Sequence, residues 1–490
     1  MIRPVFVGNV LLSLLFELVV HAAPPHPGAG LELSECRISA APGYPGVKAR
    51  CGILLRHLDP ADPQSPLLNL NVAVVPALNL NPEADPLVAI AGGPGGASTT
   101  FYAGYEAAFE KVRRNRDIVL LDQRGTGKSE ALTCDLDEDA ITGQFSAEET
   151  AALAKECLDA LPYDPRFFTT SVAVRDLEAL RLALGYPAFN IYGISYGTRV
   201  AQHYARRYPQ TTRSVILDGV VPPQIPLGPG IAIEAQNALQ SIFDRCAQDP
   251  ACNDAFPDLE QEFRQLRQRL SQHAAQLTIP DPVTGNPRDV KFGGQELAVP
   301  LRLMSYDPAT VALMPLLIHQ AATGNIGPLA ATFLNVQEGL DDQIAIGMHN
   351  AVVCTEDVPF FDDPDTGALA KTYIGTAMIE ALGAICSVWP AGILDDDLRV
   401  PLNTDKPVLL LSGSADPVTP PRFASLAAIK LSNSRELIGE HQGHGQAARG
   451  CVPDIIGRFV ETASIAELDT DCMQRLFTMP FFLDFSGPAP

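Results

Sequence analysis

The segment Phe189-Asn190-Ile191-Tyr192-Gly193-Ile194-Ser195-Tyr196-Gly197 decides the fold of this chain. It begins with a short apolar run typical of a buried strand, and a helix-like segment follows from about Thr198. A serine in the sharp turn between strand and helix projects its hydroxyl from the edge of the sheet, and flanking glycines let the two elements approach closely. The pattern predicts a nucleophile elbow with Ser195 as the nucleophile.

Around this segment, short apolar runs alternate with amphipathic stretches, which is typical of a mostly parallel sheet covered by helices. The predicted buried strands are Leu70–Val75, Leu87–Ala91, Ile118–Leu121, Phe189–Tyr192, Val215–Leu217, Val408–Leu411 and Arg435–Ile438. The predicted helices of this part are Glu148–Leu161 and Val174–Leu184. Most strands end in loops rich in Gly or Asp, where α/β sheets place their ligands.

The pattern changes at Val220-Val221-Pro222-Pro223, after which helical periodicity dominates and strand signals nearly vanish. We therefore expect a helical cap at residues 222–395, inserted between two sheet-forming segments, 24–221 and 396–490. Its predicted helices are Ala232–Ala247, Leu259–Gln276 and Met314–Ala322. The last of these helices contains His319, which we interpret as a packing residue.

A serine hydroxyl is a poor nucleophile at neutral pH, so Ser195 needs a base and a carboxylate that orients the base. Asp416 follows the strand Val408–Leu411, and His444 lies between two glycines after the last strand signal. Serine, acid, histidine is the chain order that accompanies a nucleophile elbow. Asp218, which also ends a strand, and His441 are the alternatives, and a metal held by the two histidines lacks an evident third ligand.

The loop Gly92-Gly93-Pro94-Gly95-Gly96 directly follows the strand Leu87–Ala91. Backbone amides there are placed to face a developing oxyanion, and Pro94 has no N–H to give. We expect Gly93 and the residue after the nucleophile, Tyr196, to donate these hydrogen bonds. The alternative is an ordinary glycine turn.

Gly125-Thr126-Gly127-Lys128-Ser129 ends like a phosphate-binding loop, but its spacing does not fit one. Such a loop needs a glycine five residues before the Gly of Gly-Lys-Ser, and that position is Asp122. We interpret Asp122-Gln123-Arg124-Gly125 as a structural loop beside the predicted catalytic edge.

The composition bounds the function. The chain has 490 residues, 46% of them hydrophobic, which is enough for one large core or two adjoining ones. Its formal charge of −22 opposes binding to nucleic acid phosphates or to anionic lipid. We expect neither partner, and no cofactor or metal.

The N-terminal residues have the three parts of a secretory signal. A basic start is followed by the apolar stretch Val5–Val20 and by small residues that favour cleavage after Ala22 or Ala23, so residues 1–23 are the predicted signal peptide. The alternative is an uncleaved membrane anchor, although Asn9 and Glu17 interrupt the run.

Ten cysteines, an even number, agree with export to the periplasm or the medium, where thiols pair. The sequence alone does not fix their connectivity. Pairing of sequence neighbours gives the hypothesis Cys36–Cys51, Cys134–Cys157, Cys246–Cys252, Cys354–Cys386 and Cys451–Cys472. Metal binding is the alternative, but the chain offers no tight C-x-x-C cluster.

The chain resembles secreted tripeptidyl aminopeptidases, which are larger relatives of prolyl iminopeptidases. The resemblance rests on the elbow, the Gly92–Gly96 loop, the Asp122–Gly127 loop, Asp416 and His444. The resemblance covers about Asp85 to Val460 and includes Cys386-Ser387-Val388-Trp389-Pro390. It implies an α/β-hydrolase fold with a cap, Ser195 as nucleophile, Asp416 as orienting acid and His444 as base. It also implies an oxyanion hole at Gly93 and Tyr196.

The same resemblance suggests how a substrate is bound. Exopeptidases of this kind use cap carboxylates for the free amine, which makes Glu356 and Asp357 candidates; the alternative is a solvated or helix-capping acidic pair. Prolyl iminopeptidases usually begin the oxyanion loop with His, whereas this chain has Ala91, which weakens an expectation of proline specificity.

The expected function is therefore that of an exported serine hydrolase that cleaves short peptides from a free N-terminus through an acyl-enzyme. One alternative keeps the same residues but changes the substrate to esters or other acyl compounds. Another alternative is a silent binding protein on a hydrolase scaffold, because a fold does not by itself confer activity.

Overall fold

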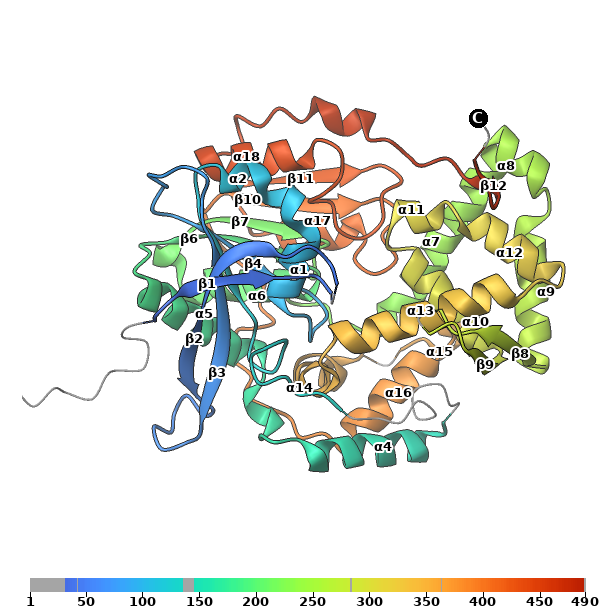
Figure 1. The fold of residues 1–490 in the computed structure, drawn as a ribbon, viewed down its shortest axis with the longest axis horizontal. Helices are drawn as coiled ribbons and strands as arrows, with labels where there is room; N and C mark the ends of the chain where they lie inside the picture. The colour runs from blue at the N-terminus through green and yellow to red at the C-terminus, as the bar shows by residue number, and fades with distance from the viewer. Residues whose placement is uncertain (1–30, 42, 135–144, 283, 363, 489–490) are drawn as a thin grey trace, which may run out of the picture.

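Nine strands form one twisted sheet, and β6, the strand that leads to Ser195, lies near its centre (Figure 1). The computed structural model describes residues 31–41, 43–134, 145–282, 284–362 and 364–488, so the predicted signal peptide lies outside the described residues. The spatial order is β1-β2-β3-β5-β4-β6-β7-β10-β11. The strands are β1 Ser34–Ile38, β2 Val47–His57, β3 Leu67–Val75, β4 Leu87–Ile90, β5 Ile118–Leu121, β6 Phe189–Ile194, β7 Thr212–Asp218, β10 Val408–Gly413 and β11 Ser434–Gly439.

The sheet is parallel from β5 to β11 and antiparallel from β1 to β5. The parallel strands β4, β5, β6 and β10 are buried at every residue, as expected for strands covered on both faces. Two strands of this sheet that the sequence analysis missed, β1 and β2, alternate charged and apolar residues over part of their length and lie at one edge of the sheet. A search for apolar runs does not detect that pattern.

Helices cover both faces of the sheet. Helices α5 (Thr170–Leu184), α6 (Tyr196–Arg207) and α17 (Pro421–Ala428) pack on one face, and α1 (Ser98–Tyr105), α2 (Glu110–Arg113) and α18 (Val452–Thr462) pack on the other. Short 3₁₀ turns complete this part: η1 Glu106–Phe109, η2 Pro165–Phe167, η3 Pro209–Thr211 and η5 Asp471–Arg475. The sheet and these helices are the mostly parallel α/β architecture that the sequence predicts.

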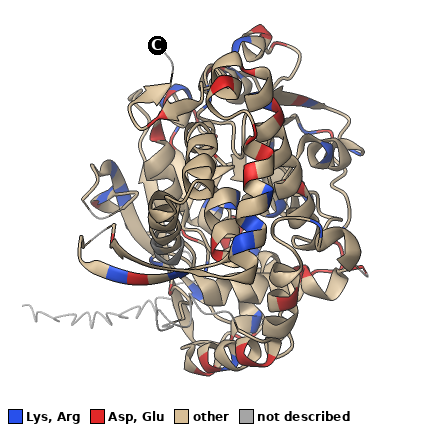
Figure 2. Ribbon diagram, turned by 90° about the vertical axis from the view of Figure 1, so that its right-hand side faces the viewer, with Lys and Arg blue, Asp and Glu red and all other residues tan. Residues whose placement is uncertain are grey.

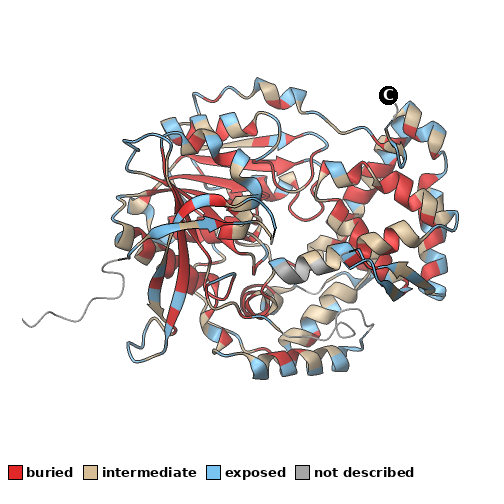
Figure 3. Cartoon of the chain, viewed as in Figure 1, coloured by how far each residue is buried: buried red, intermediate tan, exposed pale blue. Residues whose placement is uncertain are grey.

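The chain between β7 and β10 is mostly helical and has a buried core of its own (Figure 3). Its elements are α7 Pro229–Gln248, α8 Pro250–Ala255, α9 Leu259–Gln272, β8 Ala275–Pro280, β9 Pro287–Phe292, α10 Gly294–Met304, α11 Pro308–Val311, α12 Met314–Ala322, α13 Gly327–Gln343, α14 Ile346–Glu356, η4 Val358–Phe360, α15 Thr366–Leu369 and α16 Ala377–Cys386. We call this region the cap.

The cap contains one clear departure from the sequence analysis. The predicted helix Leu259–Gln276 is wrong at its end, because α9 stops at Gln272 and residues 275–280 form β8, which pairs with β9 as an antiparallel hairpin. The physical reason is the alternation of half-buried and exposed residues along β8, which has the period of a strand rather than a helix.

Packing crosses the predicted cap boundaries in three places. Helix α14 lies within the predicted cap, yet Met348 and Val352 belong to the core under the sheet. Helix α4 (Ala147–Ala160) lies in the predicted N-terminal segment and packs against α16. The C-terminal residues run back across the molecule to the cap, where Phe481 is buried and the short strands β12 (Phe482–Asp484) and β13 (Gly487–Pro488) lie (Figure 1).

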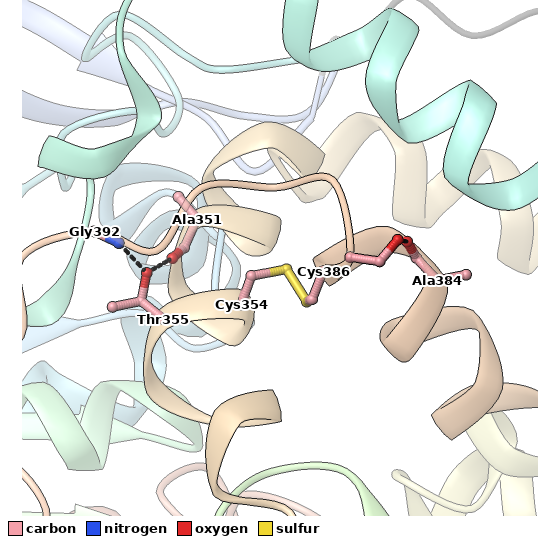
Figure 4. Close-up of a disulfide and its surroundings, with 7 residues drawn as sticks. Ala351, Cys354, Thr355, Ala384, Cys386 and Gly392 are labelled. Atoms are coloured by element: carbon pink, nitrogen blue, oxygen red, sulfur yellow. Dashed lines mark hydrogen bonds between the residues drawn. A yellow bond between two sulfur atoms is a disulfide. The ribbon is translucent and has the colours of Figure 1, made fainter.

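Five disulfides brace the chain, and their pairs are the sequence neighbours of the hypothesis. The Cys354–Cys386 bond joins the end of α14 to α16, and beside it Thr355 accepts a hydrogen bond from the Gly392 amide at 2.8 Å (Figure 4). Two disulfides and Trp389 form one small apolar cluster at this point. Among the described residues, no helix has the length and apolarity needed to cross a membrane.

Candidate active site

Ser195 occupies the turn between β6 and α6 in a strained conformation, with φ 54° and ψ −126°. The flanking glycines are required by close backbone approaches: a Cβ on Gly193 would lie 2.2 Å from the Gly197 carbonyl oxygen, and one on Gly197 would lie 2.5 Å from that of Ala91. Ser195 is partly exposed, whereas both of its chain neighbours are buried. The geometry is that of a nucleophile elbow.

Asp416 and His444 meet at the same edge of the sheet. Asp416 lies in the loop after β10, and His444 lies in the loop after β11. The His444 Nδ1 atom is 2.8 Å from Asp416 Oδ2, and Thr419 Oγ1 donates to the same carboxylate oxygen at 2.8 Å. The pairing through Nδ1 leaves Nε2 as the atom that can accept a proton from a serine.

Burial and charge together set the protonation of this pair. Burial disfavours the imidazolium, but the charge and hydrogen bond of Asp416 outweigh it and raise the pKa of His444 above its usual value. Burial also disfavours the Asp416 carboxylate, and His444 with the Thr419 and Val418 amides outweighs it and lowers the pKa of Asp416. Asp416 therefore stays ionised and stabilises the imidazolium that forms when His444 takes a proton.

The His444 ring lies over the ends of the strands that lead to Ser195. A Cβ on Gly219, the residue after β7, would lie 2.8 Å from His444 Cε1, and the carbonyl of Asp218 accepts the Ser195 amide at 2.9 Å. Within the described part of the chain, neither Ser195 Oγ nor His444 Nε2 has a hydrogen-bond partner. The hydrogen bond between these two atoms that a catalytic triad uses is therefore not formed in this structure.

The alternative acid and base have other surroundings. The Asp218 carboxylate accepts the backbone amides of Gln446 and Ala447 at 2.7 and 2.8 Å and the Tyr192 hydroxyl at 2.8 Å. It therefore holds the loop that follows His444. The His441 side chain is 45% exposed and has a single weak ion pair, with Glu440 at 3.9 Å. The structure brings Asp416 and His444 together and leaves Asp218 and His441 outside that pair.

The predicted oxyanion loop passes directly beside the nucleophile. A Cβ on Gly92 would lie 2.9 Å from Ser195 Cβ, and the next residue, Gly93, is exposed with φ 113°. Tyr196 is the first residue of α6, so its amide has no intrahelical partner. Its hydroxyl is fixed by Thr170 at 2.7 Å and Gln123 at 3.1 Å. The loop that holds Gly93 and the first amide of α6 thus both adjoin Ser195, and their role as an oxyanion hole stays a prediction.

Glu356 and Asp357 are completely buried and paired with an internal cation. Arg199 lies 2.7 Å from Asp357 and 3.4 Å from Glu356, and Thr170 donates two hydrogen bonds to Glu356 at 2.8 Å. Burial raises the pKa of Glu356 to about 7, against the opposing effects of Arg199 and Thr170. Their role in binding a substrate amine stays a prediction, and these contacts give them a different one: they join α14 to the helix of the elbow.

The loop Asp122–Gly127 has the structural role that the sequence analysis gave it. The Asp122 carboxylate accepts the Thr99 amide at 2.9 Å and the Asn71 side chain at 2.8 Å, and Arg124 is buried against Asp176 at 2.6 Å. His319 pairs with Glu262 at 2.9 Å and packs on Phe256, in agreement with a packing role.

Sequence reasoning missed the cap residues that reach the site. The Tyr306 carbonyl accepts the His444 amide at 2.8 Å, and the Tyr306 ring packs edge-on against the imidazole with 5.0 Å between centroids. A Cβ on Gly443 would lie 2.4 Å from that carbonyl oxygen, which explains the glycine before the histidine. The Ala345 amide also donates to Gly95 at 3.1 Å. No local pattern in the sequence marks Tyr306, because only the fold brings α10 to this edge.

One group of potential metal ligands occurs among the described residues, formed by His203, Asp395 and Asp397. Arginines already occupy it: Arg175 lies 2.8 Å from Asp395, Arg207 lies 3.4 Å from Asp397, and Arg206 lies 3.0 Å from His203 Nδ1. The group is an ion-pair cluster on the side of α6 away from the elbow.

The sheet order, the strained serine at the elbow and the Asp416–His444 pair define an α/β hydrolase. Comparison with known proteins agrees. The family model described as "alpha/beta hydrolase fold" matches residues 85–300, and the model described as "TAP-like protein" matches residues 371–472. The chain therefore has the α/β hydrolase fold, and its C-terminal part is similar to TAP-like proteins.

Individual relatives cover shorter stretches. The serine protease Hip1 of Mycobacterium tuberculosis is 31% identical over 258 residues, which is 48% of each chain. The tripeptidyl aminopeptidase of Streptomyces lividans is 29% identical over 212 residues, 40% of this chain and 39% of that protein. The match therefore spans about half or less of these relatives. The solved proline iminopeptidase of Mycobacterium smegmatis has a TM-score of 0.38 and 14% identity, over 81% of this chain and 96% of that one.

Proposed function

We propose that this protein is an exported serine aminopeptidase that releases short peptides or amino acids from free N-termini through an acyl-enzyme. The observation that carries the proposal is the Asp416–His444 pair beside Ser195 at the elbow, under a cap that contacts both the base and the oxyanion loop. Relatives named as proteases and aminopeptidases support the same reaction class. Five disulfides support the oxidising periplasm or medium as the destination.

The proposed reaction follows from the position of each group. Ser195 Oγ attacks the scissile carbonyl carbon while its proton moves to His444 Nε2, and the Gly93 and Tyr196 amides stabilise the oxyanion. The C–N bond then breaks, and His444 gives the proton to the leaving amine. Water, deprotonated by the same histidine, releases the acyl group and restores Ser195.

The contacts of the cap support an exopeptidase over a general protease. Tyr306 packs against His444, and the Ala345 amide donates to the Gly95 carbonyl in the predicted oxyanion loop, so cap residues contact the groups around Ser195. A short peptide with a free end enters such a site more easily than the middle of a long chain.

The test combines a nucleophile variant with matched substrates. Ser195→Ala should lose more than about 10³-fold in kcat and should lose labelling by a fluorophosphonate, because only an activated serine reacts. Peptidyl nitroanilides with free or acetylated N-termini should differ, with the free form cleaved faster. Retained peptidase activity in Ser195→Ala would refute the mechanism.

The alternative functions give other results in the same assays. Short-chain nitrophenyl esters cleaved much faster than every peptide would make the protein an esterase. Equal cleavage of the acetylated peptide would exclude an aminopeptidase. A folded wild-type protein that takes up no fluorophosphonate would be a binding protein.

A further inference from the structure

The cap places one cation, Arg302, close to His444, and the proposed reaction gives this arginine no role. Arg302 lies on α10, and its Nη2 atom donates to the Tyr306 hydroxyl at 3.3 Å. Tyr306 in turn packs against the His444 ring and accepts the His444 amide. The guanidinium is thus separated from the catalytic base by one side chain.

The positive charge of Arg302 acts on two histidines near the site, His349 and His444, and lowers the pKa of each. Burial is the main cause that lowers the pKa of His349, and Arg302 adds to it; the Nδ1 atom of His349 lies 3.2 Å from the Pro94 carbonyl in the oxyanion loop. At His444, burial and Arg302 oppose the rise in pKa that Asp416 causes. A positive charge beside a base that must become positive is unfavourable for the base, so its presence needs another reason.

Arg302 has no carboxylate partner among the side chains that the structure describes. Its Nε atom is buried without a hydrogen-bond partner. Arg302 is half-buried. Among the described residues, the fully buried Arg124 and Arg199 pair with Asp176 and Asp357, whereas the half-buried Arg245 and Arg267 also lack a carboxylate partner. What sets Arg302 apart from these two is its contact with Tyr306, the residue that packs against His444. Acidic residues outnumber basic ones, 57 to 35, and residues of both signs are scattered over the elements that face the viewer in Figure 2, so an unmatched guanidinium is not due to a lack of acids.

An arginine with unmet N–H groups fits a planar carboxylate, which can accept two parallel hydrogen bonds. Its position beside His444 indicates which part of a substrate would supply that group. His444 donates the proton to the leaving amine, so groups packed around it face the leaving fragment.

We propose that Arg302, with the Tyr306 hydroxyl, is a carboxylate-binding subsite for the leaving fragment of the substrate. The proposal rests on the function proposed above and adds a specificity to it: the enzyme prefers substrates with a carboxylate close after the scissile bond. That carboxylate comes either from the free C-terminus of a one-residue leaving fragment or from an Asp or Glu side chain at the first leaving position.

The first experiment compares three short peptides that share the acyl part. One has a leaving alanine with a free carboxylate, one has a leaving alaninamide, and one has a leaving aspartic acid amide whose side chain carries the only carboxylate. For the wild-type enzyme we expect kcat/KM to be about 10- to 100-fold higher for at least one carboxylate peptide than for the alaninamide peptide, the range of a charge-assisted hydrogen bond. Which carboxylate peptide is preferred identifies the source.

Variants of Arg302 test the residue itself. In Arg302→Gln the carboxylate-to-amide ratio should fall close to one, and Arg302→Lys should retain part of it. Arg264→Gln is the matched control, because Arg264 is an exposed cap arginine that pairs with Glu260 on α9, and it should keep the wild-type ratio. An Arg302→Gln enzyme with an unchanged ratio would overturn the proposal, as would a parallel loss on all three peptides.

A binding measurement separates this proposal from the proposed function. Calorimetry with Ser195→Ala and with Ser195→Ala/Arg302→Gln reports affinity for the same peptides without turnover. The added Arg302 change should weaken binding of the preferred carboxylate peptide about 10- to 100-fold and shift that of the alaninamide peptide far less. That result supports the subsite even if Ser195 proves not to be the nucleophile. Equal weakening for both peptides would refute it.

Discussion

Replacement of Asp416 by Asn tests the catalytic pair most directly, because it changes one atom and its consequences follow from the contacts. The Asp416 carboxylate accepts four hydrogen bonds: Oδ1 accepts the Val418 and Thr419 amides at 2.9 and 2.8 Å, and Oδ2 accepts Thr419 Oγ1 and His444 Nδ1, both at 2.8 Å. An Asn carbonyl oxygen can keep the two backbone bonds. The fold should therefore survive.

The new amide group would face His444 Nδ1 and donate to it. His444 would then carry its proton on Nε2, where it cannot accept the proton of Ser195. A wrong tautomer of this kind lowers kcat about 10⁴-fold, which corresponds to about 5 kcal/mol of transition-state stabilisation.

The pH dependence should change in a defined direction. In the wild-type enzyme kcat/KM should rise as His444 loses its proton, and because Asp416 raises the pKa of His444, the acid limb should lie above pH 6.5, the ordinary pKa of histidine. In Asp416→Asn the raising charge is gone while burial remains. The residual activity should therefore titrate below pH 6.5.

The assay is hydrolysis of a peptidyl nitroanilide from about pH 5 to pH 9, with circular dichroism to verify folding. Asp454→Asn is the matched control, because this side chain is 65% exposed on α18, and it should behave like the wild type. Asp416→Asn with more than about one tenth of the wild-type kcat and an unshifted acid limb would show that Asp416 does not orient the base.

Two further changes test the surroundings of the pair. Asp218→Asn should lower kcat about 10- to 100-fold, because one amide oxygen cannot accept the Gln446, Ala447 and Tyr192 donors together and the His444 loop shifts; fluorophosphonate labelling at the wild-type rate would contradict this. Loss of the Cys354–Cys386 disulfide by double Ser substitution opens a loop of 32 residues and should cost about 4 kcal/mol in the free energy of unfolding, against about 2 kcal/mol for Cys246–Cys252, whose loop has 6. Urea denaturation measures both, and equal losses would contradict the loop-entropy argument.

The sequence was sufficient where local patterns carry the information. Buried parallel strands such as β5 are continuous apolar runs, and the close backbone approaches at Gly193 and Gly197 leave glycine as the one residue that fits. The positions of Asp416 and His444 after two predicted strands were enough to predict that they lie at one edge of the sheet, because the loops after parallel strands share that edge. The α/β fold class and the family resemblance followed from the same features, and both are confirmed.

The sequence was insufficient where the outcome depends on partners far apart in the chain. Glu356 and Asp357 have the composition of an amine-binding pair, and only the fold shows that Arg199, 157 residues before Glu356 in the sequence, pairs with both of them. Likewise β2 alternates because it lies near the sheet edge, and α9 ends where a hairpin partner becomes available. Periodicity within a segment cannot report such partners.

His444 is held by the core and by the cap at the same time. The cap is therefore in contact with the predicted catalytic base and does more than cover it. Asp416, in the core, holds the ring of His444 through Nδ1. The backbone amide of His444 is held from the cap, by the Tyr306 carbonyl. A Cβ at Gly443 would collide with that carbonyl, so the glycine allows cap and base to be in contact. Because the cap holds the base, movement of α10 away from the core would withdraw the support of His444 as well as open the entrance. In the proposed mechanism, substrate entry and the activation of Ser195 would therefore depend on the same backbone hydrogen bond, between the His444 amide and the Tyr306 carbonyl.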